Sequence, residues 1–217
     1  MPRIACLHTA PSNVAVFDAA LRQLSLPHVV LSHRVRADLL AAAERAGGLT
    51  ATVAGETGQA LQSLCGDADA VLLTCSTLGP AADALAASAT PILRVDTALA
   101  GAAVAQAQAA PGGLVVLCAV ATTMAPTRAL FARAAEAAGV AVSIRLVPDA
   151  WAAFRAGDAA SYHRLIATAA EAAIAEGAGC VALAQASMAG AVRLVPGGGL
   201  LDSPSIGLAA AIRAAGG

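Results

Sequence analysis

The sequence predicts an α/β protein made of two similar lobes, each a parallel sheet flanked by helices. Four short apolar runs, each leading into small polar residues and then a helix-like segment, lie at residues 4–7, 70–73, 114–119 and 180–184. Such runs between helices are typical of buried parallel strands. The pattern recurs, since Thr9 and Cys75 are 66 positions apart (75 − 9) and Thr122 and Gln185 are 63 apart (185 − 122).

Capping residues and glycines set the expected helix boundaries. Ser12 is expected to cap a helix at residues 13–24, and Asp158 one at residues 159–176 that stops at Gly177. Another helix is expected from Thr123 to residue 138, before Gly139. Shorter helices are expected at residues 36–46, 56–65, 80–87, 97–109 and 205–214.

These elements predict a first lobe at residues 1–97 and a second at residues 98–204, with the helix at residues 205–217 returning to the first lobe. Ligands of parallel α/β sheets bind at the carboxyl ends of the strands. We therefore expect the lobes to be related by pseudo-twofold symmetry, with a small-molecule site between them at the polar strand ends.

The composition argues against several classes of protein. Residues of hydrophobic type make up 58% of the chain and charged residues 12%, with a net charge of −1. No basic tract is available for nucleic acid. The uncharged stretch between Asp96 and Arg128 is interrupted by glutamine, proline and glycine, which argues against a membrane span. With no signal-peptide pattern after Pro2 and Arg3, a cytoplasmic location is the default, and the apolar content is compatible with a homo-oligomer.

The residue types also limit the chemistry. All 13 basic residues are arginine, so no lysine can form a Schiff base or complete a phosphate-binding P-loop. The five cysteines are odd in number and scattered, which indicates reduced thiols. Cys6 and His8 are the one weak pair of potential ligands, so we expect no metal, and we expect no cofactor.

Two strand-end segments now carry a family resemblance. Residues 71–77, VLLTCST, resemble the first catalytic-cysteine segment of the aspartate/glutamate/hydantoin racemase superfamily, and residues 183–189, LAQASMA, resemble its second. Residues 92–96 and 114–127 are similar to the segments that leave its first lobe and open its second. The resemblance implies a two-lobe fold, no cofactor, and proton transfer by two cysteines on opposite sides of a substrate carbon.

The chain departs from that pattern at one position. By the match of the second segment, Gln185 stands where the second cysteine is expected, and an amide is neither acid nor base near pH 7. Cys180 lies five strand residues earlier, roughly 16 Å away at about 3.3 Å per residue. Cys118 is also expected inside the sheet. Two-thiol racemisation is therefore in doubt.

The residues at the first segment have both functional and ordinary interpretations. Cys75 lies between a strand and an expected helix N-terminus, where a thiolate is favoured, and could move a proton at carbon. The alternative is an inert buried cysteine. Ser76 and Thr77 could bind a substrate carboxylate or simply cap the helix.

The remaining candidates lie at the other three strand ends. We expect them to contribute to substrate binding, with helix capping as the alternative, and they are Thr9, Thr122, Thr123, Gln185, Ser187 and Met188. His8 could act as a general acid or base, although a surface or capping histidine is the commoner case. The other histidines have no evident partners in the sequence.

Three functions are compatible with this pattern. The first is a cofactor-independent racemase or related isomerase acting on a small carboxylate such as an amino acid or a hydantoin-like compound, with Cys75 as the proton-transfer residue. The second is a one-cysteine decarboxylase or lyase of malonate-like acids. The third is a non-catalytic small-molecule-binding protein on the same scaffold.

Overall fold

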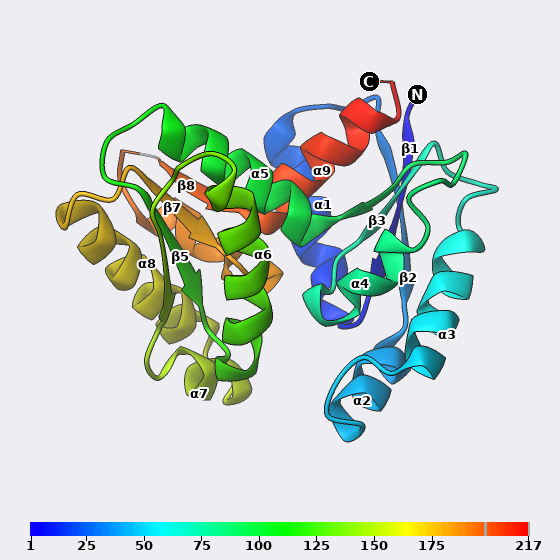
Figure 1. Ribbon diagram of the computed structural model, residues 1–217, viewed down its shortest axis with the longest axis horizontal. Coiled ribbons are helices and arrows are strands. Elements are labelled where there is room, and N and C mark those ends of the chain that lie inside the picture. The colour runs from blue at the N-terminus through cyan, green and yellow to red at the C-terminus, as the bar shows by residue number, and fades with distance from the viewer. Residues whose placement is uncertain (198, 217) are drawn as a thin grey trace. The chain divides into compact units, whose positions relative to one another are not determined.

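The computed structural model describes residues 1–197 and 199–216 and contains two compact units. Unit 1 consists of Met1–Ala98 and the described part of Pro204–Gly217, and unit 2 consists of Leu99–Ser203. Each unit contains a four-stranded parallel sheet with helices on both faces (Figure 1). The predicted α/β class with two similar lobes is confirmed.

The two sheets share one strand order. The sheet of unit 1 runs β2-β1-β3-β4 and that of unit 2 runs β6-β5-β7-β8. The strands of unit 1 are β1 (Arg3–His8), β2 (Val30–Val35), β3 (Ala70–Leu73) and β4 (Ile92–Arg94). Those of unit 2 are β5 (Leu114–Cys118), β6 (Val142–Leu146), β7 (Cys180–Leu183) and β8 (Leu200–Asp202). The two central strands of each sheet are the apolar runs that the sequence identifies.

Helices cover both faces of each sheet because the central strands are buried on both sides. In unit 1, one face packs against α2 (Ala37–Arg45), α3 (Ala51–Gln62) and α4 (Gly79–Asp83). The other face packs against α1 (Ser12–Leu24) and α9 (Ser203–Ala214), where Gly207 approaches Leu72 closely. In unit 2, α7 (Ala150–Arg155) and α8 (Ala159–Ala175) pack on one face of the sheet. The remaining helices of this unit are α5 (Val95–Gln108), which begins at the end of unit 1, and α6 (Met124–Glu136).

Several predicted boundaries are confirmed and others are wrong. Asp158 caps α8 by accepting a hydrogen bond from the Ser161 amide, as expected. Ser12, in contrast, lies inside α1 and caps nothing. Helix α3 begins at Ala51 rather than residue 56, because the Thr50 hydroxyl accepts from the Val53 amide and forms the cap there. Helix α4 has only five residues, so the expected helix at residues 80–87 is largely wrong.

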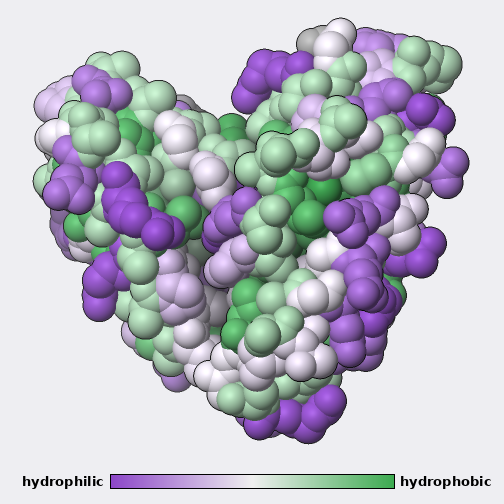
Figure 2. All heavy atoms as spheres, turned by 45° about the vertical axis from the view of Figure 1, so that its right-hand side comes forward, coloured by the Kyte–Doolittle hydropathy of each residue, from purple (hydrophilic) through white to green (hydrophobic). Residues whose placement is uncertain are grey.

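The surface of the described residues is mixed in polarity. Figure 2 shows hydrophobic and hydrophilic residues interspersed on one face of the molecule. The exposed large hydrophobic side chains are scattered over several elements, for example Val30, Leu146, Trp151 and Leu194. Within residues 1–197 and 199–216, every helix is too short or too polar to span a bilayer.

Candidate functional site

Cys75 lies just beyond the carboxyl end of β3, in the connection to α4. Its backbone is extended, with φ −115° and ψ 113°, and it leads into a 3₁₀ turn over Ser76–Leu78. The residue is only 9% exposed and packs in the core that β3 shares with α3 and α4. Because strand side chains alternate, Cys75 faces α2, α3 and α4, whereas Thr74 faces α1. The thiol is therefore shielded, with its neighbours fixed by packing.

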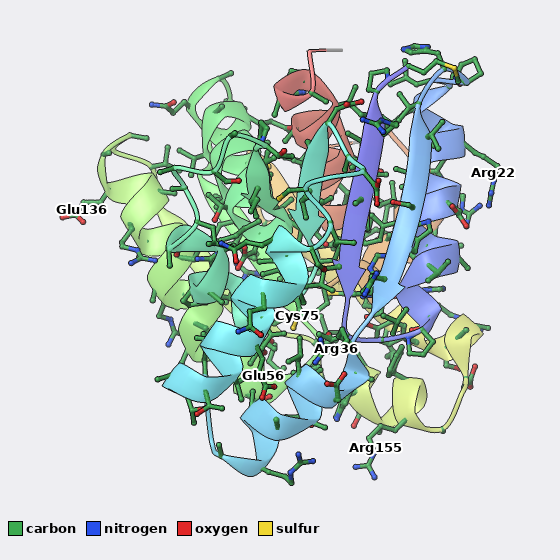
Figure 3. All side chains as sticks on the ribbon, turned by 90° about the vertical axis from the view of Figure 1, so that its right-hand side faces the viewer. Arg22, Arg36, Glu56, Cys75, Glu136 and Arg155 are labelled. Atoms are coloured by element: carbon green, nitrogen blue, oxygen red, sulfur yellow. The ribbon has the colours of Figure 1, made fainter. Side chains whose placement is uncertain are left out.

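The hydroxyl groups of Ser76 and Thr77 follow Cys75 and are half-buried. In the described part of the chain, neither hydroxyl makes a hydrogen bond to another residue. The connection between β2 and α2 ends in the same region, because the Arg36 amide donates to the His8 carbonyl oxygen at 2.8 Å. Figure 3 shows Cys75, Arg36 and Glu56 at the end of the sheet toward which the strands of unit 1 point. Free hydroxyl groups beside a shielded thiol suit the binding of a polar ligand.

The helix that follows Cys75 is too short to support the predicted role of a helix N-terminus. The 3₁₀ turn and α4 together provide no long run of aligned peptide dipoles. An anion at this turn would depend on the hydroxyl groups of Ser76 and Thr77 and on the local amides. The Arg36 guanidinium is half-buried and is held in a forked contact by Asp38, at 2.7 to 3.0 Å.

His8 connects the ends of β1 and β3 through hydrogen bonds. Its Nδ1 lies 2.8 Å from the Thr74 hydroxyl oxygen, and that hydroxyl donates to the Leu7 carbonyl oxygen at 3.0 Å. His8 is fully buried, so the expectation of a surface histidine is wrong. Burial first, and then the neighbouring His33, lower the pKa of His8 to about 4. A histidine that is neutral near pH 7 and has no access to solvent does not suit the predicted role of general acid.

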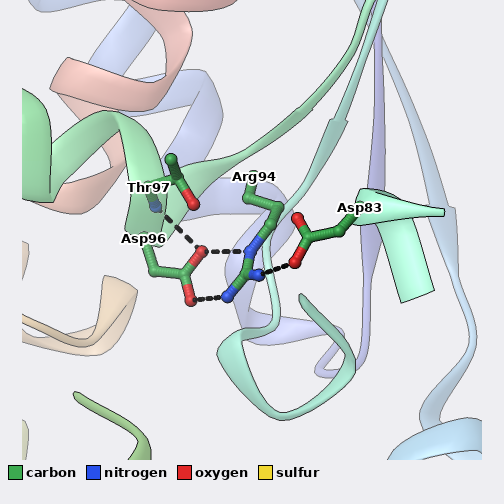
Figure 4. A network of polar contacts seen from close by, with 4 residues as sticks. All are labelled: Asp83, Arg94, Asp96 and Thr97. Carbon is green, nitrogen blue, oxygen red and sulfur yellow. Dashed lines mark hydrogen bonds and ion pairs between the residues drawn. The ribbon is translucent and has the colours of Figure 1, made fainter. Parts of the chain in front are cut away.

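Arg94 supports the turn that carries Cys75. Its guanidinium binds Asp96 through Nε and Nη2, at 3.0 and 2.8 Å, and Asp83 of α4 through Nη1 at 2.6 Å (Figure 4). Burial alone would lower the pKa of Arg94, but the hydrogen bonds and charges of Asp96 and Asp83 outweigh it and raise the pKa. A Cβ atom at Gly79 would overlap the guanidinium, so a larger residue there would displace Arg94 from its contacts with Asp96 and Asp83.

Gln185 occupies in unit 2 the position that Cys75 occupies in unit 1. Leu73 pairs with Leu7 and Leu183 pairs with Leu117, and each candidate residue follows two positions later, before a 3₁₀ turn. The Gln185 amide is bound within its own unit. Its Oε1 accepts from the Ala119 amide at 2.7 Å, and its Nε2 donates to the Thr123 hydroxyl at 2.9 Å. Gln185 therefore joins the ends of β5 and β7.

The other polar candidates of unit 2 are also engaged, with one exception. The Thr123 hydroxyl donates to the Val120 carbonyl at 2.7 Å, and the Met188 amide donates to the Gln185 carbonyl at 3.0 Å. The Ser187 hydroxyl lies 2.8 Å from the hydroxyl of Tyr162. Thr122 is exposed, and its hydroxyl makes no hydrogen bond within the described residues. Binding of a ligand by Thr123, Ser187 or Met188 would need these local bonds to be exchanged.

The cysteines differ in their surroundings. Cys6, Cys118 and Cys180 are buried in strands, and burial raises the pKa of Cys6 to about 12 and of Cys180 to about 11. Burial also raises the pKa of Cys118, although hydrogen bonds with Thr127, Gln185 and Thr123 oppose it. These three thiols therefore lie in the protein core. Cys65 is half-buried three residues beyond the end of α3, and its thiol lies 3.5 Å from the Leu61 carbonyl oxygen.

Comparison with known proteins identifies the fold. The sequence matches no protein-family model and no curated protein. The structure matches an aspartate racemase from Picrophilus torridus with a TM-score of 0.72 at 12% identity, over 100% of this chain and 95% of that chain. An allantoin racemase from Klebsiella pneumoniae matches at 0.68 and 13% identity, over 98% and 87%. A glutamate racemase from Bacillus anthracis matches at 0.65 and 16% identity, over 98% and 82%.

The chain has the fold of the aspartate/glutamate/hydantoin racemases. The resemblance seen in the two strand-end segments is thus confirmed at the level of fold. Identities of 12 to 16% show the fold and leave the reaction to be argued from the residues.

Sequence reasoning missed the residues that hold the candidate site in place. Arg36 follows β2, an edge strand that was not predicted, and Arg94 acts through a glycine contact that only the structure reveals. His33 and His163 also have partners, which the sequence analysis did not foresee. His33 contacts His8 and Asp18, and His163 contacts the Ser187 carbonyl oxygen. The pair Gly79 and Arg94 has one detectable signal in the sequence, a glycine two positions after the segment at residues 71–77.

The Arg94 network can be tested by stability. Arg94→Ala is expected to destabilise the protein by about 3 to 5 kcal/mol, because it leaves the buried Asp96 carboxylate unpaired. The matched control is Arg145→Ala, which removes the exposed pair with Glu176 and should change stability by about 0 to 1 kcal/mol. Urea unfolding of both variants measures the difference. Equal effects would show that the Asp96 contact is not a buried ion pair.

The burial of the Tyr162 hydroxyl can be tested by titration. Tyr162 is the only tyrosine, so tyrosinate absorbance reports on this residue alone. Burial raises its pKa to about 12, with the Ser187 hydrogen bond acting in the opposite direction. Because the folded pKa exceeds the unfolded value of about 10, its contribution to stability is complete below pH 10 and is lost as the pH rises through about 12. A midpoint near 10 in the folded protein would contradict the burial of this hydroxyl.

Proposed function

We propose that the protein is a cofactor-independent isomerase of the racemase type that transfers a proton at the α-carbon of a small carboxylate through Cys75. The observation that carries the proposal is the Cys75 turn of unit 1. It combines a shielded thiol with two half-buried hydroxyl groups that have no partner among the described residues. A fold shared with racemases of aspartate, glutamate and allantoin supports it. Amino acids and hydantoin-like compounds are therefore the substrates to examine first.

The proposed chemistry needs few groups. The Cys75 thiolate removes the α-proton, the electron pair of the C–H bond moves into the carboxylate as an enolate, and the thiol keeps the proton. Ser76 and Thr77 donate hydrogen bonds to the substrate oxygens, whose negative charge increases in the transition state. A water molecule on the opposite face would deliver the second proton and give the enantiomer, after which Cys75 returns its proton to solvent. Gln185 cannot supply that proton, because an amide is not an acid near pH 7.

One observation favours a second candidate, a lyase that uses a single thiol. Gln185 is bound by Ala119 and Thr123 and brings no acid to the position equivalent to Cys75. Decarboxylation of a malonate-like acid creates the carbanion by loss of carbon dioxide, with no base needed. The Cys75 thiol would then protonate one face of the α-carbon. Such a reaction requires one acid, whereas racemisation requires a base on one face of the α-carbon and an acid on the other.

The proposal also includes binding contributions from Thr9 and from the candidates of unit 2. Thr9 is buried at the end of β1, and Thr122 is exposed at the start of the 3₁₀ turn after β5. For Thr123, Gln185, Ser187 and Met188 the predicted contact with a ligand stays a prediction, since each now has a local partner.

The experiment measures interconversion of enantiomers by chiral chromatography. The panel consists of both enantiomers of aspartate, glutamate and substituted hydantoins, with release of carbon dioxide from alkylmalonates and arylmalonates measured in parallel. We expect turnover of at least one compound, and a loss of about 10²- to 10⁴-fold in Cys75→Ala, the range for a positioned acid or base. The matched control is Cys65→Ala, which removes the half-buried cysteine of unit 1 and should keep activity.

The outcomes distinguish the candidates. Conversion of one enantiomer into the other supports the isomerase, and carbon dioxide release without such conversion supports the lyase. A variant Cys75→Ala with the activity of the unchanged protein would refute both. Thermal stabilisation by a ligand, without turnover of any compound, would leave a binding protein on a racemase scaffold.

A further inference from the structure

Three potential metal ligands converge on one face of the sheet of unit 1. Cys6 and His8 are two residues apart on β1 and therefore point to the same face. His33 lies on the adjacent strand β2, directly opposite Cys6 in the parallel register. One ligand atom from each of the three residues lies within 4.8 Å of the other two. The sequence shows only the pair on β1, because His33 is 25 residues away from His8 along the chain.

Each of the two imidazole rings is held by a hydrogen bond at the ring nitrogen that points away from the cluster. The Nδ1 atom of His8 is held by the Thr74 hydroxyl at 2.8 Å, and the Nε2 atom of His33 is held by an Asp18 carboxylate oxygen at 3.1 Å. The remaining ring nitrogens, Nε2 of His8 and Nδ1 of His33, face each other at 2.9 Å. Metal-binding histidines characteristically donate their second ring nitrogen to a carboxylate or another oxygen. Both histidines of this cluster have that arrangement.

The hydrogen-bond directions indicate which ring nitrogens carry a proton when no ion is bound. The Thr74 hydroxyl gives its proton to the Leu7 carbonyl, so His8 Nδ1 must donate to Thr74. A neutral His8 then presents a lone pair on Nε2, and His33 Nδ1 must supply the proton between the rings. The Nε2 atom of His33 faces the Asp18 carboxylate, which can only accept a hydrogen bond while it is ionised. Removal of the proton on Nδ1 would leave a lone pair on each of the two facing nitrogens, near the Cys6 thiol.

Cys6 completes the set. Its side chain is fully buried beside the two rings, and its thiol has no hydrogen bond within the described residues. One thiolate and two imidazoles form a ligand set preferred by zinc and related divalent ions of borderline softness. The charges also balance, since a divalent cation would be matched by the Cys6 thiolate and the Asp18 carboxylate. Asp18 is 42% exposed and the His33 side chain 15%, which gives an ion a route from solvent.

We propose that Cys6, His8 and His33 bind one zinc ion or a similar divalent ion, with Asp18 and Thr74 orienting the two histidines. Binding releases the thiol proton of Cys6 and the proton between the rings, and a water molecule takes the fourth position of a tetrahedral ion. The ion joins β1 to β2 and, through His33 and Asp18, to α1. Since Cys75 faces the opposite side of the sheet, the role is structural and independent of the proposed reaction.

The test uses the full-length chain without a tag, freed of metal by a chelator. Equilibrium dialysis against Zn²⁺ should retain one ion for each chain, and Co²⁺ should give a thiolate-to-metal charge-transfer absorption. We expect Cys6→Ser to abolish that absorption and to lose Zn²⁺ retention. The matched control Cys180→Ser removes another buried strand cysteine and should bind as the unchanged protein does. Asp18→Asn should weaken binding by about 10- to 100-fold, the usual effect of losing a group that orients a ligand.

Circular dichroism of the metal-free variants separates lost binding from lost folding. If Cys6→Ser does not fold, His33→Gln decides the matter, because its side chain reaches the surface and its loss leaves the core of β1 intact. Stoichiometric binding by the unchanged protein, lost in Cys6→Ser or in His33→Gln, supports the site. No Zn²⁺ retention, no thiolate absorption with Co²⁺, or undiminished binding in a folded ligand variant would overturn it.

Discussion

The parallel register of the central strands determines which side chains reach the functional edge of each unit. Leu7 lies opposite Leu73 in unit 1, and Leu117 lies opposite Leu183 in unit 2. Both strands of each pair end at the same level, so the residues that follow them are brought together. Cys75 and Gln185 thereby occupy equivalent positions. A slip of one residue would turn Cys75 toward α1 and separate it from the core that shields its thiol.

The alternation of side chains divides the edge of unit 1 into two chemically different faces. Thr74 faces α1 and belongs to the buried polar chain that runs through His8 and His33 to Asp18. Cys75 faces the opposite helices, beside hydroxyl groups that are free within the described residues. In unit 2, the equivalent amide is used to connect the local strand ends. The two units thus share a strand order but differ in the chemistry available at their edges.

The sequence was sufficient for the parts of the fold that depend on local pattern. The four buried strands form continuous apolar runs. Asp158 stands immediately before a helical segment, the usual place of a capping carboxylate, and accepts from the Ser161 amide. The edge strand β2 has no apolar run, because its residues are exposed or half-buried and half of them are polar, so the sequence does not predict it. The overestimate of α4 has a similar cause, since an alanine-rich segment has high helix propensity whether or not tertiary contacts continue the helix.

The candidate site was predictable in its central residue and not in its supporting contacts. Cys75 was identified by its position after an apolar run, which is local information. The burial of His8, the Gly79 contact with Arg94 and the internal bonding of Gln185 all depend on residues far away in the chain. No periodicity or spacing encodes which polar atoms find a partner. The distinction between free and engaged hydroxyl groups therefore comes from the structure alone.

The central claim, that Cys75 moves a proton at carbon, is tested most directly by hydrogen exchange into substrate in D₂O. Nuclear magnetic resonance would follow the α-proton of each compound in a panel of amino acids and hydantoins. We predict that the α-proton signal of at least one compound disappears with the unchanged protein and persists with Cys75→Ala. Exchange with inversion would identify a racemase, and exchange with retention would identify proton transfer on one face. Exchange that continues undiminished in a folded Cys75→Ala variant would contradict the claim.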